Sequence, residues 1–144
     1  MLMPDVNVLV YAHREDEAVH EAARTWVDDM VNGSEPFALS ALVAVGFVRI
    51  VTNPRIYRDP TPVPVALAAM ESILARPNCR LCLPGARHWE LVGRLCRESQ
   101  AAGKNVADAQ HAAVAIEHGC EWFTRDRDFA RFERSGLRWR RFEV

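Results

Sequence analysis

Lysine is almost missing from this 144-residue chain: Lys104 is the only one, and arginine supplies every other permanent positive charge on a side chain. Arginine suits planar, bidentate contact with phosphate or carboxylate better than lysine does. The base composition of the genome explains the same bias equally well. The formal net charge is -1, so no global basic field indicates a nucleic-acid partner.

Long hydrophobic runs are also missing. No window approaches the roughly 18 apolar residues of a membrane span. Asp5 interrupts the apolar N-terminus and no basic region precedes it, so we expect no signal peptide. The four cysteines resemble core residues of a protein in a reducing compartment, and no second metal-ligating pair follows the Cys-x-x-Cys: Cys79, Cys82, Cys96 and Cys120. We therefore expect a cytoplasmic protein without a zinc site.

Several catalytic signatures are absent as well. The chain has no glycine-rich phosphate loop and no Gly-x-Ser-x-Gly elbow, and its five histidines are scattered without metal-ligand spacing. Apolar residues make up 49% and charged residues 26%, as in typical soluble globular proteins. At this length the chain can bury one proper core, so residues 1–144 are expected to form a single domain.

Hydrophobic periodicity predicts strands that alternate with helices. The expected strands cover residues 2–6, 36–39, 79–83, 120–124 and 137–144. The expected helices cover residues 16–31, 40–51, 65–75, 89–99 and 105–118, with a short one within 125–134. Residues 53–64 read as an ordered proline-rich loop. Pro4 indicates that the first strand lies at an edge of the sheet or begins there. This alternation predicts an α/β sandwich with a mainly parallel sheet.

Four carboxylates stand at the boundaries of these expected elements. Asp5 ends the first strand among apolar neighbours, and Asp108 lies in the first turn of the last long helix. Asp126 and Asp128 follow the fourth strand. Because the carboxyl ends of parallel strands share one edge of a sheet, we expect these side chains to converge.

Converging carboxylates repel one another unless a cation neutralises them, and burial makes an unpaired carboxylate costly. Oxygen-only ligands select hard ions such as Mg²⁺ or Mn²⁺, which serve attack on phosphodiesters. Taken singly, the acids have ordinary interpretations. Asp108 suits any helix N-terminus, and Asp126 with Asp128 suits a solvated charged turn.

Four segments spread over the whole chain follow the order of motifs in a known family: Pro4–Leu9, Arg49–Asn53, Val106–Ala113 and Thr124–Phe132. They resemble PIN-domain ribonucleases, specifically the toxins of VapBC toxin–antitoxin systems. The resemblance implies a three-layer α/β/α sandwich with a parallel central sheet. It also implies Mg²⁺- or Mn²⁺-dependent endoribonuclease activity on structured RNA, commonly tRNA or rRNA. The implied partners are a VapB-type antitoxin that blocks the site and a second copy in a homodimer.

The resemblance carries the family's metal-binding and catalytic acids onto Asp5, Asp108 and Asp126. Asp128 matches an additional acid of the family, and we consider it a candidate general base. Thr124 and Asn7 match two polar positions of the same pocket. We assign the two polar residues to substrate binding.

Several basic residues near the acids have two interpretations each. Arg125 and Arg127 are candidates to contact RNA phosphates, or they belong to a solvated charged turn. Arg49 could pair with an acid of the site or be an ordinary surface arginine. His111 lies one turn beyond Asp108 and could touch a substrate or simply pack.

One position departs from the family pattern. Many relatives carry a glutamate three residues before the arginine that matches Arg49, whereas this chain has Gly46 and no acid between Glu35 and Asp59. The site then has one carboxylate fewer, which leaves the number of metal ions open. This departure supports an alternative: a catalytically weak PIN-fold domain that binds RNA or another protein.

Overall fold

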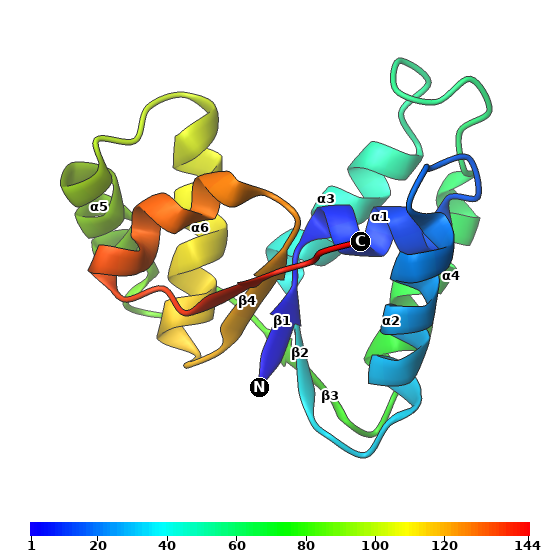
Figure 1. Ribbon diagram of the computed structural model, residues 1–144, viewed down its shortest axis with the longest axis horizontal. Coiled ribbons are helices and arrows are strands. Elements are labelled where there is room, and N and C mark those ends of the chain that lie inside the picture. The colour runs from blue at the N-terminus through cyan, green and yellow to red at the C-terminus, as the bar shows by residue number, and fades with distance from the viewer.

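A five-stranded sheet lies at the centre of the computed structural model, which describes residues 1–144 (Figure 1). Its strands are β1 (Leu2–Pro4), β2 (Phe37–Ser40), β3 (Cys79–Cys82), β4 (Glu121–Thr124) and β5 (Trp139–Arg141). The order across the sheet is β3-β2-β1-β4-β5, and every neighbouring pair is parallel. The prediction of a mainly parallel sheet is confirmed.

Helices form a layer on each side of this sheet (Figure 1). The first layer contains α1 (Val6–His13), α2 (His20–Asn32), α3 (Ala41–Val51) and α4 (Val63–Leu74). The second contains α5 (His88–Ser99), α6 (Lys104–Glu117) and the 3₁₀-helix η1 (Arg127–Ser135). The three-layer α/β/α arrangement is therefore confirmed, and residues 40–51 contribute a helix rather than a strand. No helix is both long and apolar enough to cross a membrane.

The chain reverses direction across the sheet beside β1. From β1 it builds outward through β2 to β3, using the first helical layer, and then returns through α5 and α6 to β4 on the other side of β1. The crevice at the carboxyl ends of β1 and β4 is thus the topological switch point, where open α/β sheets bind their ligands.

One hydrophobic core joins the two layers through the sheet. It comprises 31 buried residues, including Met3 of β1 and Trp122 of β4. Trp26 of α2 stacks on Phe123 of β4 with ring centroids 3.9 Å apart. On the other face, buried Ala112 of α6 lets that helix lie close to the strands.

The first strand differs from its predicted position and length. β1 is the central strand and ends at Pro4, whereas Pro4 was expected at an edge or a strand start. The missing N–H of Pro4 falls at the last residue of the strand, and the Asp5 N–H resumes the ladder with a 2.8 Å bond to the Phe123 carbonyl. Asp5 is the N-cap of α1, and residues 7–13, for which the sequence predicts a turn of helix or a loop, form a regular helix.

The start of α6 also differs from the prediction. This helix was expected to begin at Asn105, but it begins one residue earlier, with Gly103 as its N-cap at a φ of 58° that favours glycine. The helix begins at Lys104, so Asp108 lies beyond the first turn rather than within it. The final strand is shorter than expected and covers only Trp139–Arg141.

Candidate active site

Asp5 is held between two hydrogen-bond donors at the carboxyl end of β1. As the N-cap of α1, its Oδ1 accepts the Val6 N–H at 2.6 Å. Its Oδ2 accepts the Thr124 hydroxyl at 2.5 Å. The residue is only 7% exposed. The N-terminus of α1 and the end of β4 therefore fix the two oxygens of one buried carboxylate.

Thr124 ends β4 and joins Asp5 to the next acid along the chain. Besides donating to Asp5, its Oγ1 accepts the Asp126 N–H at 3.0 Å and the Asn7 amide at 3.4 Å. Thr124 was expected to line the pocket and bind substrate. Its side chain is completely buried beneath the acids, so it can position them but not reach a substrate.

Asp108 on α6 and Asp126 in the turn after β4 form a cluster of three carboxylates with Asp5. The Oδ2 atom of Asp108 is buried and has no hydrogen-bond partner. Asp126 caps η1, with its Oδ1 accepting the Asp128 N–H at 2.9 Å. Segments about a hundred residues apart in the sequence thus meet at one sheet edge, as expected from the parallel topology.

The electrostatics of these acids favour protonation or a cation. Burial raises the pKa of Asp5 to about 7, the charges of Asp108 and Asp126 add to the rise, and the Thr124 and Val6 hydrogen bonds oppose it. Burial also raises the pKa of Asp108. Burial therefore disfavours the charged form of both carboxylates, although both oxygens of Asp5 accept hydrogen bonds.

Lys104 is a neighbouring cation that the sequence analysis overlooked. Its Nζ lies 3.4 Å from Asp128 Oδ2 and 4.0 Å from Asp126 Oδ2. The lysine side chain is 71% exposed, so solvent weakens both pairs. Its position four residues before Asp108, directly before the predicted helix 105–118, was the available signal.

A cleft of about 440 Å³ opens over the acids. Its lining includes four residues of the predicted site: Asp5, Asn7, Asp108 and Asp126. Four others lie outside this lining: Asp128, Thr124, Arg125 and Arg127. The structure thus brings the three proposed metal ligands into one cleft and leaves Asp128 outside its lining, paired with Lys104.

Two further candidates, Arg49 and His111, also line the cleft. Arg49 makes no ion pair with an acid, which leaves its guanidinium available to a ligand. The His111 ring stacks on Trp122 at 5.4 Å. Burial lowers the pKa of His111 to about 4, and the nearby Arg49 adds to that shift, so the imidazole is neutral near pH 7.

Three cleft residues were not singled out from the sequence: Tyr11, Glu17 and Tyr57. The Tyr57 hydroxyl donates to Glu17 Oε1 at 2.7 Å across 40 residues of sequence. No local pattern marks such a pair, because a lone glutamate in a charged turn reads as solvated.

The region of Gly46 confirms that no carboxylate comes from α3. A Cβ built at Gly46 would lie 3.1 Å from Val6 Cγ2, and Val6 lines the cleft. A side chain at position 46 would therefore start beside the residue that follows Asp5.

The carboxylates fit a hydrated hard cation better than a fully caged one. No three His, Cys, Asp or Glu side chains lie close enough together to hold an ion directly. Mg²⁺ commonly binds through one or two carboxylates and keeps several waters. The unpartnered Asp108 Oδ2 and the raised pKa of Asp5 are the features that such an ion would satisfy.

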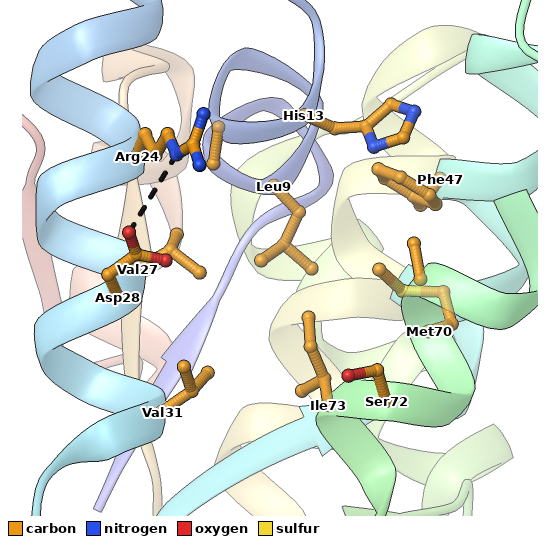
Figure 2. A pocket seen from close by; sticks show the side chains of 12 residues that line it. Leu9, His13, Arg24, Val27, Asp28, Val31, Phe47, Met70, Ser72 and Ile73 are labelled. Carbon is orange, nitrogen blue, oxygen red and sulfur yellow. Dashed lines mark ion pairs between the residues drawn. The ribbon is translucent and has the colours of Figure 1, made fainter. Parts of the chain in front are cut away.

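A second cavity lies away from these acids, between α1, α2, α3 and α4 (Figure 2). It measures about 220 Å³ and shares no lining residue with the cleft. Its walls are mainly apolar, with Leu9, Val27 and Phe47 facing the gap and the Arg24–Asp28 pair, at 3.8 Å, on α2 (Figure 2). It offers no cluster of catalytic groups.

Comparisons with known proteins agree with the fold and with the motifs. The PIN domain family model matches residues 2–135. Ribonuclease VapC43 of Mycobacterium tuberculosis is 44% identical over 140 residues, covering 97% of this chain and 94% of the relative. Ribonuclease VapC25 of the same organism is 42% identical, covering 92% and 93%. The solved structure of VapBC2 from Rickettsia felis, bound to a promoter DNA fragment, superimposes with a TM-score of 0.68 at 17% identity, covering 99% of this chain and 98% of the other.

Proposed function

The chain belongs to the PIN-domain family and to its VapC-type ribonucleases, and we propose that it hydrolyses phosphodiester bonds of structured RNA with Mg²⁺ bound at Asp5, Asp108 and Asp126. Mn²⁺ is expected to substitute, because both ions prefer oxygen ligands. The observation that carries the proposal is Asp5, a buried carboxylate whose pKa is raised to about 7 beside two other acids at the switch point.

The residues in and around the cleft have distinct roles in the proposed reaction. Thr124 and the Val6 N–H fix the Asp5 carboxylate. Asp108 and Asp126 would hold the ion directly or through its waters, and Arg49 and Lys104, which line the same cleft, would attract the phosphate. A bound Mg²⁺ supplies Lewis-acid polarisation of the phosphodiester and a lower pKa for water. Asp128 remains the proposed general base, although it lies outside the cleft lining and pairs with Lys104.

Cleavage assays test the assignment of the acids. Asp5→Asn and Asp108→Asn should each abolish Mg²⁺-dependent cleavage of a structured RNA and leave the circular dichroism spectrum unchanged. Asp28→Asn is the matched control, because Asp28 lies on α2 with its side chain 59% exposed. Cleavage by Asp5→Asn at the parent rate would remove the basis of the proposal.

We also propose a VapB-type antitoxin as the inhibitory partner and a homodimer as the assembly, with cytoplasmic location. The likeness in fold to the Rickettsia felis VapBC2 structure supports this reading. Co-expression with the product of a short neighbouring gene should yield a stable complex without cleavage activity. Light scattering on the isolated chain should give twice its 16.3 kDa mass.

The alternative of a catalytically weak binding domain rests on Gly46 alone. The relatives that match most of the chain carry ribonuclease names, and three acids remain at the sheet edge. The cleavage assay separates the alternatives, because a pure binding domain would leave RNA intact at every metal concentration.

A further inference from the structure

We propose that the end of the cleft away from the acids is a nucleobase subsite, in which the Glu17 carboxylate accepts hydrogen bonds from the Watson–Crick edge of a guanine beside the scissile phosphate. The subsite rests on the proposed RNA cleavage at the other end of the same cleft. Its walls include Glu17, Tyr57 and Tyr11, in one continuous lining with Asp5.

Glu17 presents an oriented carboxylate rather than a freely moving one. It lies in the turn between α1 and α2, where its N–H donates to the Arg14 carbonyl and its own carbonyl accepts the His20 N–H, both at 3.2 Å. Its Oε1 accepts the Tyr57 hydroxyl at 2.7 Å. Its Oε2 has no partner within the protein and is available to a ligand.

Tyr57 is itself locked in place. The residue is 7% exposed, and the Arg14 guanidinium lies 4.1 Å from its ring centroid. Arg14 in turn pairs with Asp16 at 2.6 Å and donates to the Asp59 carbonyl at 2.8 Å. The turn that bears Glu17 and the loop that bears Tyr57 are thus tied together, so little ordering is needed when a ligand binds.

The polarity of this pair decides what can bind. Burial and the contact with Glu17 raise the pKa of the Tyr57 phenol, so the phenol keeps its proton and donates it to Glu17 Oε1. A phosphate has only acceptor oxygens and would be repelled. In RNA the donors are the 2′-hydroxyl and the N–H groups of the bases.

Guanine fits this acceptor best among the bases. Its Watson–Crick edge carries two adjacent N–H donors, N1–H and N2–H, that match the two oxygens of a carboxylate. Each carboxylate oxygen has two lone pairs, so Oε1 can accept from Tyr57 and from the base together. Exposed edges of this kind occur in the single-stranded loops of structured RNA.

Helix α1 connects the subsite to the acids. Asp5 caps this helix, and Asn7, Val10 and Tyr11 lie along the face that lines the cleft. At 1.5 Å per residue, Tyr11 is about 9 Å along the axis from Asp5, which is the scale of a nucleotide. The Tyr11 ring, with Arg125 at 5.6 Å from its centroid, adds an aromatic surface on which a base can stack.

Glu17 is separate from the proposed metal ligands. No hydrogen bond or ion pair joins Glu17 to Asp5, Asp108 or Asp126, and its only side-chain hydrogen bond within the protein comes from Tyr57. Glu17 therefore belongs to the substrate side of the cleft rather than to the cluster of Asp5, Asp108 and Asp126.

Base substitution at the cleavage site tests the subsite. A stem–loop RNA with a randomised loop first locates the cleaved bond, and each neighbouring guanine is then replaced by inosine, which lacks the N2 amino group. Fluorescence anisotropy with the Asp5→Asn protein, which does not cleave in the proposed mechanism, should show binding weakened on the order of tenfold by one such replacement. Glu17→Gln in that background should remove the difference, while Glu21→Gln, at a side chain 94% exposed on α2, should preserve it.

Each outcome decides the matter. Equal binding of guanine and inosine RNAs, or a difference that survives Glu17→Gln, overturns the subsite. A Glu17→Gln enzyme that needs more Mn²⁺ for half-maximal cleavage, with its base preference intact, places Glu17 in the metal site and also overturns it. Failure of the proposed function shows separately, as full cleavage by Asp5→Asn.

Discussion

At the scale of one residue, the ionised Asp5 carboxylate that the proposed function needs lowers the stability of the folded protein. Its pKa is about 7 in the folded protein and about 3.8 for an ordinary aspartate. The folded state therefore binds more protons between these values, so the stability contributed by neutral Asp5 is complete below about pH 4 and is lost as the pH rises to about 7.

Asp5→Asn should remove this loss. Asparagine can still cap α1, and it carries no charge to bury. In EDTA at pH 8 the variant should be more stable than the parent by up to about 4 kcal/mol, and the difference should vanish near pH 4. Urea unfolding at both pH values measures it. Comparing the two proteins cancels other titrating groups such as His111, and a variant less stable than the parent at pH 8 would contradict the account.

Thr124 is a positioning residue that works through Asp5 and Asp126. Thr124→Val keeps the shape but leaves Asp5 Oδ2 without its donor and the Asp126 N–H without its acceptor. We expect cleavage to fall about 10- to 100-fold, as when partners of metal ligands are removed. Thr124→Ser, which keeps the hydroxyl, should recover most of the rate and the metal dependence. Parent-like kinetics for the valine variant would show that the hydroxyl is dispensable.

At the scale of helices and strands, the contact between α1 and α3 determines whether a glutamate can be introduced at position 46, where many relatives carry one. Gly46→Glu places an acid beside Val6, but its Cβ begins 3.1 Å from Val6 Cγ2 and crowds that side chain. Val6→Ala together with Gly46→Glu relieves the crowding. The double variant should reach half-maximal cleavage at a several-fold lower Mn²⁺ concentration than Val6→Ala alone. An unchanged Mn²⁺ requirement would show that position 46 does not reach the metal.

The order and type of most elements could be predicted because their periodicity is local. The Val- and Ile-rich stretch 40–51 was resolved as a helix by its length, and the strands around 79–83 and 120–124 lie where alternation placed them. The position of β1 could not be predicted, because the pairing that puts Pro4 at the centre of the sheet is set by distant strands.

The same division holds for the site. Asp5 and Asp126 follow strands and Asp108 lies near the start of α6, and parallel topology brings these places together, so their convergence in one cleft could be predicted. The sequence predicted that Thr124 lines the pocket, whereas it is buried beneath Asp5. This burial could not be predicted, because it depends on how β1 and β4 pair. Glu17 and Tyr57 were missed because only the fold brings the turn after α1 to the loop after α3.

The whole molecule is expected to unfold as one unit. The two helical layers look separate in Figure 1, but 31 buried residues form one core through the sheet. Calorimetry of the metal-free protein should therefore show one cooperative transition. Two resolved transitions would mean that the layers are independent, and the single-domain prediction would then be wrong.

The proposed metal binding at the sheet edge would link the whole fold to the chemistry of Asp5. A divalent cation requires the ionised carboxylate, so binding must displace the proton that Asp5 holds near neutral pH. With a pKa of about 7, roughly half a proton should leave per ion bound at pH 7.

Calorimetric titration of the parent and Asp5→Asn proteins with Mn²⁺ at pH 7, in two buffers of different ionisation enthalpy, measures this linkage directly. The account predicts saturable binding by the parent, with a heat that changes between buffers by the equivalent of about half a proton, and loss of that signal in Asp5→Asn. Identical titrations for the two proteins would contradict the central claim that Asp5 binds the metal.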